Sequence, residues 1–305
     1  APYNRDAVWV FIKYRTSGSW EHLPLSTYEA DYAVESELPV QIHAQQTGFL
    51  VERAAPGQGT ANARITITLP NAYTADNVRF RIMGMEMVYI PESSFYLGDG
   101  ASINSFRRGD SPAPYHVTSN TAIPIGSEAT SLSADIEEAP AGSVPQSYPK
   151  GYHAFYAMKY EITQSQYRDF LNMLSFVHQE ARTAVPPAEN AGTFAMQEAG
   201  GNRNGIAIRR PGTHPDVPAV YACNLHGDGS FNQPDDGAAI PVNWLKWADL
   251  SAYLDWAGLS PMTEMEYEKI CRGPTYPVPG EIAWSTPHVK DANTLVNAGF
   301  ANETV

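Results

Sequence analysis

The pattern of hydrophobic and polar positions changes along this chain, and its N-terminal part carries a strand pattern. Short runs of β-branched and aromatic residues, separated by turns rich in Gly, Pro, Asn and Asp, predict strands at residues 8–15, 48–53, 64–69 and 78–82. In the third run, strict alternation places Ile65, Ile67 and Leu69 on one face. We therefore predict a small β-sandwich over residues 1–82.

A helical period replaces this alternation further along the chain. Thr163 and Gln166 have the spacing of a capping box at a helix start. The apolar stripe of the same helix consists of Tyr167, Phe170, Leu171, Leu174 and Val177. We assign this stripe to the core of a domain that follows the strands.

Two more helices are predicted toward the C-terminus. The apolar face of the first consists of Trp247, Leu250, Tyr253, Leu254 and Ala257. Asp249 is expected to point outward from this helix, and Gly258 to end it. The second helix starts at a capping box of Thr263 and Glu266 and ends at Gly273.

The residues of these stretches resemble the formylglycine-generating enzyme (sulfatase-modifying factor) superfamily. Residues 87–98 are similar to its opening strand and turn, and residues 159–171 to its first helix. The residues that match its later motif include Trp247, Asp249, Thr263, Glu264, Glu266 and Arg272. The resemblance implies an α+β chain, in which the β-sandwich of residues 1–82 is followed by a formylglycine-generating-enzyme-like (C-type-lectin-like) domain over residues 83–305 that lacks its C-terminal half.

The resemblance also implies which chemistry to look for. Enzymes of this family oxidise a substrate cysteine with a copper ion held by two cysteines, but Cys223 and Cys271 do not correspond to that pair. The helical domain that carries a three-histidine iron site in related enzymes is also missing, and no hydrolase pattern occurs. We therefore predict a non-catalytic binding or structural module. The alternative is the front part of a sulfatase-modifying, copper- or iron-dependent oxidase whose catalytic half is not in this chain.

Composition argues against several classes of binding partner. A formal charge of −13, with only 20 basic residues spread along the chain, argues against a nucleic-acid surface. No apolar run approaches the length of a membrane span, and the glycines of residues 200–205 lack the strand-then-helix setting of a nucleotide loop. We expect a bacterial or phage protein, secreted or on the cell surface, whose signal peptide has been removed before Ala1. Its partner would be a protein or glycan ligand, or other subunits of a surface assembly.

One loop carries a pattern typical of metal binding. Its candidate ligands are Asp228, Asn232, Asp235 and Asp236. Carboxylates and free carbonyls in a Gly-rich stretch suit a hard cation such as calcium, although the spacing does not match the helix-loop-helix pattern. A solvated acidic turn is the interpretation that we favour over this possible calcium site.

The stretch at residues 99–149 shows no periodic apolar pattern and is rich in Ser, Pro, Ala and Gly. We expect an insertion without regular structure, either functional surface or mobile loop, in which His116 faces solvent.

Overall fold

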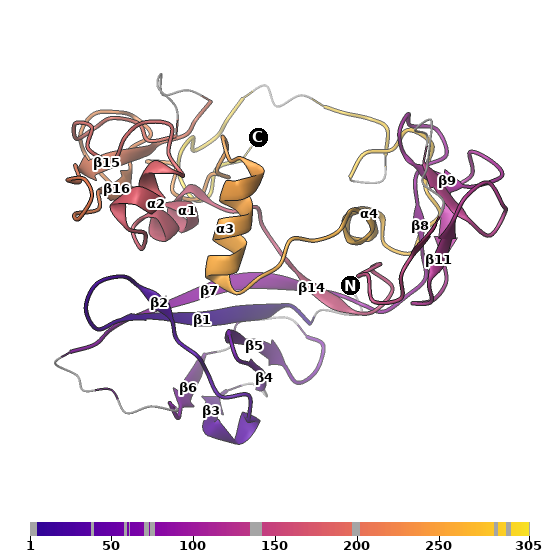
Figure 1. Ribbon diagram of the computed structural model, residues 1–305, viewed down its shortest axis with the longest axis horizontal. Coiled ribbons are helices and arrows are strands. Elements are labelled where there is room, and N and C mark those ends of the chain that lie inside the picture. The colour runs from indigo at the N-terminus through magenta and orange to yellow at the C-terminus, as the bar shows by residue number, and fades with distance from the viewer. Residues whose placement is uncertain are drawn as a thin grey trace. The chain divides into compact units, whose positions relative to one another are not determined.

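A computed structural model of the chain describes most of its length (Figure 1). The described residues are 5–37, 40–57, 60, 62–69, 73, 77–134, 142–196, 202–283, 286–290 and 294–304. The chain forms two compact units. The smaller unit contains residues 88–157 and 261–291, and the larger unit contains residues 5–87, 158–260 and 292–305.

An antiparallel sheet forms the base of the larger unit. Its strands, in spatial order, are β7 (Arg79–Ile90), β1 (Ala7–Arg15), β5 (Gly48–Arg53) and β4 (Val40–Gln45), with β2 (Glu21–His22) paired to β1 and β14 (Phe155–Met158) beyond β7. β1 and β7 pair without interruption from Ala7 opposite Met87 to Arg15 opposite Arg79. The predicted boundary between residues 82 and 83 therefore falls inside one strand, and the two compact units do not follow it.

A second, two-stranded sheet packs on the same core. It pairs β3 (Tyr32–Ser36), which follows the short 3-10 helix η1 (Glu29–Asp31), with β6 (Ala63–Ile67). The buried centre consists of Ile12, Leu23, Leu25, Tyr32, Ile42 and Phe49. Ile65, Ile67 and Leu69 pack against this centre, so the face predicted from their alternation is confirmed. β3 and β4 were not predicted, although β4 alternates Val40, Ile42 and Ala44 with polar residues.

Two short helices occur where the sequence predicted one. α1 (Gln164–Leu171) starts at the predicted capping box of Thr163 and Gln166, which is confirmed. The helix ends at Leu171, and Ser175 caps a new helix, α2 (Phe176–Glu180). The prediction of a continuous stripe through Val177 is wrong, because the restart at Ser175 turns Phe176 into the core and leaves Val177 half exposed.

α3 (Trp247–Ala257) packs against both α1 and the sheet. The Trp256 ring lies 5.5 Å from Phe170 of α1 and 5.1 Å from Phe11 of β1. The Trp9 indole donates to the carbonyl of Ala257 at 2.8 Å. Gly258 ends the helix with φ of +69°, as predicted. The strands before residue 82 and the family-like helix therefore share one core.

The burial predicted for the first turn of α3 is wrong at two positions. Trp247, expected in the core, is 68% exposed, and Asp249, expected outside, is 4% exposed. The Asp249 carboxylate accepts from the N–H of Lys246 at 2.9 Å and pairs with Arg182 at 3.3 Å. Because both oxygens of the Asp249 carboxylate are hydrogen-bonded, burying it costs little free energy of desolvation. Asp249 therefore takes the inward position that the apolar period predicted for Trp247.

The remaining elements of the larger unit are two paired strands. β15 (Ile206–Arg210) and β16 (Val220–Cys223) are antiparallel and almost entirely buried at their centres. Asn172, which follows α1, holds β16 through two bonds to the backbone of Tyr221, at 2.8 and 3.0 Å. Fully buried Gln179 of α2 holds Ala219 in the same way.

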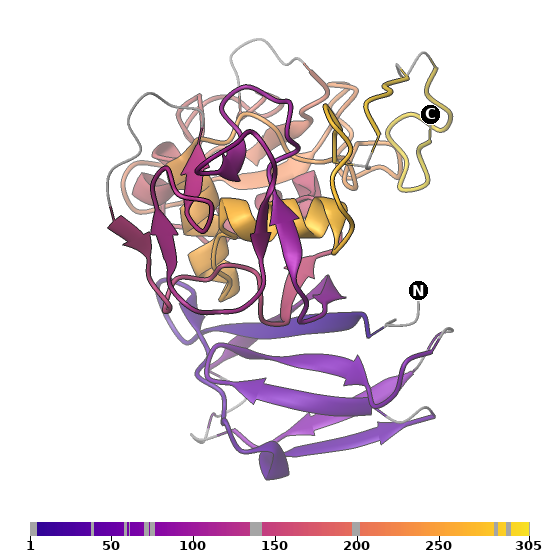
Figure 2. The ribbon, with the colours of Figure 1, turned by 90° about the vertical axis from the view of Figure 1, so that its right-hand side faces the viewer.

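The smaller unit consists of short strands around one helix. The pair β8 (Phe95–Leu97) and β10 (Tyr115–Val117) lies beside a sheet ordered β13 (Gly142–Val144), β11 (Ile123–Ile125), β12 (Leu132–Ala134) and β9 (Phe106–Arg108) (Figure 2). α4 (Glu264–Arg272) contributes Met265 to their common core. The prediction that residues 99–149 lack regular structure is wrong, because strands of three residues are too short to produce a detectable period.

Candidate functional site

Three loops of the larger unit are tied together by amide side chains. The side chain of Asn243 donates to the carbonyl of Asn202 at 2.8 Å and accepts from the side chain of Asn204 at 3.0 Å. Fully buried Gln164, at the start of α1, donates to the carbonyl of Arg203 at 2.7 Å. These bonds fix the loop before β15 against the segment that leads into α3.

An ion pair adds the C-terminal residues to this arrangement. The Arg203 guanidinium pairs with Glu303, and this hydrogen bond is the main cause that lowers the pKa of the Glu303 carboxyl. The same carboxylate accepts from the N–H of Gly299 at 2.7 Å. A Cβ atom on Gly299 would lie 2.1 Å from the carbonyl oxygen of Asp235, so the close approach of these two segments requires glycine.

Backbone strain concentrates at the same place. Asn202, Arg203 and Trp244 have φ angles of +53°, +65° and +66°. Asn enters this left-handed region readily, whereas a bulky residue such as Trp does so rarely. Each such residue costs about 1–3 kcal/mol and persists only where its surroundings determine its conformation. We call Asn202, Arg203, Asn204, Asn243, Trp244 and Glu303 the loop cluster.

Two tryptophans are displayed beside these bonds. Trp244 is 48% exposed and Trp247, three residues later, is 68% exposed. The first turn of α3 is held from inside by Asp249, so the backbone that carries Trp247 is fixed. Large exposed apolar side chains on a rigid and strained base are typical of a recognition surface rather than of ordinary packing.

Comparison with known protein families identifies the family of this chain. The family model described as the sulfatase-modifying factor enzyme 1-like domain matches residues 81–302, which is more than half of the chain. The chain belongs to this family. A search of curated proteins and a search of solved structures found no match. Among the described residues, no helix has the length and apolar character to cross a membrane.

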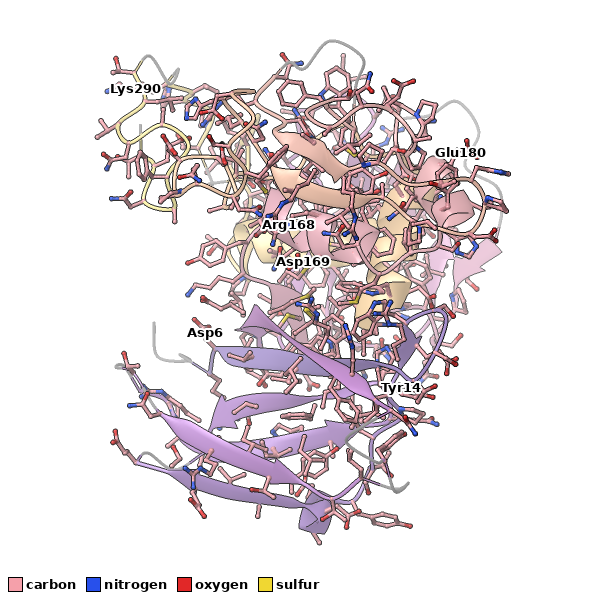
Figure 3. All side chains as sticks on the ribbon, turned by 90° about the vertical axis from the view of Figure 1, so that its left-hand side faces the viewer. Asp6, Tyr14, Arg168, Asp169, Glu180 and Lys290 are labelled. Atoms are coloured by element: carbon pink, nitrogen blue, oxygen red, sulfur yellow. The ribbon has the colours of Figure 1, made fainter. Side chains whose placement is uncertain are left out.

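The cysteines of this family member do not fit a copper pair. Cys223 lies in the larger unit and is fully buried, while half-buried Cys271 belongs to the smaller unit; both are free thiols. Burial raises the pKa of the Cys223 thiol, and its polar neighbour at 3.8 Å is the Arg168 guanidinium, which also binds Asp169 (Figure 3). This polar contact of the Cys223 thiol is therefore with a cation rather than with the second thiolate of a copper pair.

The family-motif residues of α4 have structural roles. Thr263 and Glu266 form the predicted capping box, which is confirmed, and the Thr263 hydroxyl also donates to the carbonyl of Pro149 at 2.8 Å. Glu264 is exposed in the first turn, where the helix dipole favours an acidic side chain. Arg272 pairs with Glu268 and Glu281, and so fastens the end of α4.

The predicted calcium ligands each have a local partner. Asp228 accepts from the N–H of Ser230, and Asp236 accepts from the N–H of Gln233. Asn232 accepts from the N–H of Cys223 and from Arg168, while Asp235 contacts His226 at 3.2 Å. In the part of the chain that the structure describes, no three His, Cys, Asp or Glu side chains gather as a metal site. The calcium site stays a prediction.

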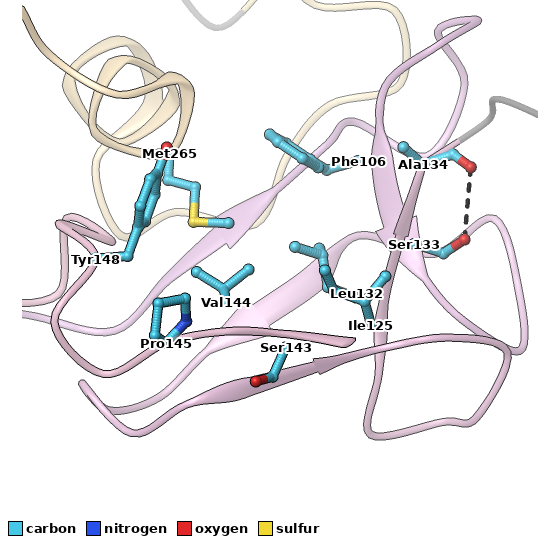
Figure 4. A pocket seen from close by; sticks show the side chains of 10 residues that line it. All are labelled: Phe106, Ile125, Leu132, Ser133, Ala134, Ser143, Val144, Pro145, Tyr148 and Met265. Atoms are coloured by element: carbon cyan, nitrogen blue, oxygen red, sulfur yellow. Dashed lines mark hydrogen bonds between the residues drawn. The ribbon is translucent and has the colours of Figure 1, made fainter. Parts of the chain in front are cut away.

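The smaller unit contains an apolar pocket of about 380 Å³ (Figure 4). Its lining residues are Phe106, Ile125, Leu132, Ser133, Ala134, Ser143, Val144, Pro145, Tyr148 and Met265. Among the described residues that line it, only Tyr148 carries an ionisable side chain. The described lining therefore offers a mainly apolar packing surface.

The sequence did not single out the residues of the loop cluster. Trp244 lies outside any periodic segment, and nothing in its residue type indicates a left-handed backbone. Asn243 and Arg203 act through loops that are far apart in the sequence. The sequence signal that could have indicated this surface is a pair of tryptophans three residues apart at the start of a helix, one of them outside the apolar period.

Proposed function

We propose that this family member is a non-catalytic binding module that contacts a protein partner through the loop cluster and its two exposed tryptophans. The observation that carries the proposal is Trp244. Its backbone is held in a conformation that costs free energy, and its indole is nevertheless half exposed. The side chain of Trp244 gains little packing within its own chain in return for this strain. The strain is explained if the conformation presents the side chain to a partner.

The surroundings of the tryptophans suit a protein interface. Trp is among the residues that contribute most to binding energy, and the most effective contacts have an apolar centre with a polar rim. Asn202 and Asn243 supply such a rim beside Trp244. A chain with a formal charge of −13 favours a partner whose contact surface is basic. We propose an extracellular or cell-surface location for this interaction.

Family membership favours a second candidate, a sulfatase-modifying oxidase whose catalytic ligands are supplied outside this chain. The two functions differ in what this chain, joined to the segment that supplies those ligands, does to a cysteine-containing peptide with Cu(I), oxygen and a thiol reductant. The binding module leaves the peptide thiol unchanged. Conversion of that cysteine to formylglycine, detected by the mass of the peptide, would establish the oxidase instead.

The binding proposal is tested by comparing three immobilised proteins. These are the wild type, the double variant Trp244→Gly/Trp247→Ala, and Tyr28→Ala, which removes a 75% exposed aromatic elsewhere in the larger unit. Each is exposed to a cell-surface protein fraction, and retained proteins are quantified by mass spectrometry. We expect a protein that wild type and Tyr28→Ala retain but the double variant loses, with a measurable Kd once purified. Equal retention by all three proteins would reject the proposal.

A further inference from the structure

We propose that the smaller unit carries a separate binding surface for a neutral glycan, formed by the rings of Tyr96, His116 and Tyr276. We call these three residues the aromatic platform. It shares no residue with the loop cluster and lies in the other compact unit, so it stands independently of the function proposed above.

The geometry of the aromatic platform is well defined. Tyr96 of β8 and His116 of β10 are direct partners across the strand pair, and their rings stack with centroids 4.3 Å apart and planes 10° apart. The Tyr276 ring meets Tyr96 edge-on, with centroids 4.9 Å apart. His116 is exposed, as predicted, and Tyr276 is 59% exposed. The two outer rings, His116 and Tyr276, are thus exposed, and Tyr96 between them is of intermediate burial.

The backbone around the aromatic platform is fixed. Tyr276 lies in the segment after α4, and this segment is anchored by the bond from the N–H of Gly280 to the Asp99 carboxylate at 3.0 Å. Asp99 is almost completely buried, and its hydrogen bonds to Ser102, Ala101 and Gly280 hold its pKa at about 2 against the opposing effect of burial. A preformed surface loses little conformational entropy when it binds.

The polar atoms of the aromatic platform are available to a ligand. Within the described residues, the hydroxyls of Tyr96 and Tyr276 and the ring nitrogens of His116 make no hydrogen bond to the protein. Arg108 and Asp110 are joined by two bonds of 2.8 Å. The hydrogen bond to Asp110 is the main cause that raises the pKa of the Arg108 guanidinium, and the Tyr276 phenol adds to it. Aromatic rings therefore lie near hydrogen-bond donors and acceptors, which include one cation and one anion.

This combination fits a pyranose better than other ligands. A pyranose presents a C–H face that packs on an aromatic ring and a rim of hydroxyls that need donors and acceptors. A nucleic acid or an acidic glycan is disfavoured by the formal charge of −13. Cross-strand pairing alone explains why Tyr96 stacks on His116, but it does not explain the exposed Tyr276, which comes from a distant segment.

Affinity electrophoresis with neutral polysaccharides tests the inference. The full chain is run through native gels that contain a β-glucan, a mannan, a xylan or a soluble chitin derivative, beside Tyr276→Ala, His116→Ala and the control Tyr160→Ala. Tyr160 is 61% exposed and belongs to the larger unit. We expect one polysaccharide to retard wild type and control, and the loss of one ring to weaken binding at least about tenfold.

Two results would overturn the inference. One is the absence of retardation in all four gels, and the other is equal retardation of wild type and Tyr276→Ala. Thermal unfolding of the same variants distinguishes a structural role from glycan binding. If a ring only stabilises the unit, its removal lowers Tm and leaves the affinity for the polysaccharide unchanged. Retention of glycan binding by Trp244→Gly/Trp247→Ala would confirm that the aromatic platform and the loop cluster are distinct sites.

Discussion

Helices α3 and α4 both carry motif residues of the family, yet their first turns are built differently. α4 is capped by its own sequence, through Thr263 and Glu266. α3 has no side-chain cap at Lys246, and its start is held by buried Asp249 together with Arg182 of a distant segment. A start fixed from inside leaves the outer face of the turn free, and there α3 displays Trp247. The comparison shows that one motif helix stabilises its unit while the other also presents a surface.

The largest effect is expected where α4 is anchored. Buried Lys269 donates to the carbonyls of Pro91, Gly151 and Tyr152. Lys269→Ala leaves these acceptors without a partner, and we expect the free energy of unfolding to fall by about 3 kcal/mol. Urea denaturation measures this, with exposed Lys290→Ala as the control. Equal stability of the two variants would show that α4 does not depend on this anchor.

A smaller loss is expected at the start of α3. Asp249→Ala removes the acceptor for the N–H of Lys246 and leaves Arg182 without its carboxylate, which should cost about 2 kcal/mol. The matched control is Asp255→Ala, which removes an exposed carboxylate from the same helix. If Asp249→Ala is as stable as this control, the inward position of Asp249 does not hold the turn.

The capping box of α4 should contribute less. Thr263→Ala removes the acceptor for the N–H of Glu266, and we expect a loss of about 1 kcal/mol in urea denaturation. Thr263→Ser keeps the hydroxyl and should unfold close to wild type. Identical loss in both variants would assign the effect to the methyl group and to packing instead.

Stability should also depend on pH, through one buried lysine beneath α3 and one in α4. Burial lowers the pKa of Lys13, beneath Trp256 of α3, and of Lys269 in α4 from 10.5 to about 8. Between these values the unfolded chain holds protons that the folded chain has released, so stability rises as pH increases from 8 toward 10, by up to about 1.4 kcal/mol per pH unit for each lysine. Lys13→Met should reduce this slope in urea denaturation. A slope that falls with pH in the wild type would contradict the burial of both lysines.

Local signals predicted the parts of this molecule that local chemistry determines. The capping boxes at Thr163 and Thr263, the stop at Gly258 and the face of Ile65 and Ile67 all depend on residues close in the sequence. The inward turn of Asp249 depends on Arg182, which is 67 residues away. Periodicity has no information about such a partner, so it assigned the wrong residue to the core.

The candidate site was less predictable than the fold for the same reason. The loop cluster is formed by Asn243, Asn202 and Glu303, which lie in three separate segments, and its strain is a property of the backbone. The aromatic platform likewise joins residues from β8, β10 and the segment after α4. Family motifs identified the helices next to these surfaces but not the surfaces themselves.

Trp244 is, we propose, held in a strained conformation that presents its half-exposed indole to a partner. The most direct measurement is a pair of values for Trp244→Gly, its free energy of unfolding and its Kd for the partner captured by wild type. Glycine tolerates the left-handed backbone, so we expect stability within about 1 kcal/mol of wild type and a clear loss of affinity. A variant that binds as tightly as wild type, or one that fails to fold, would assign Trp244 to packing and contradict the account.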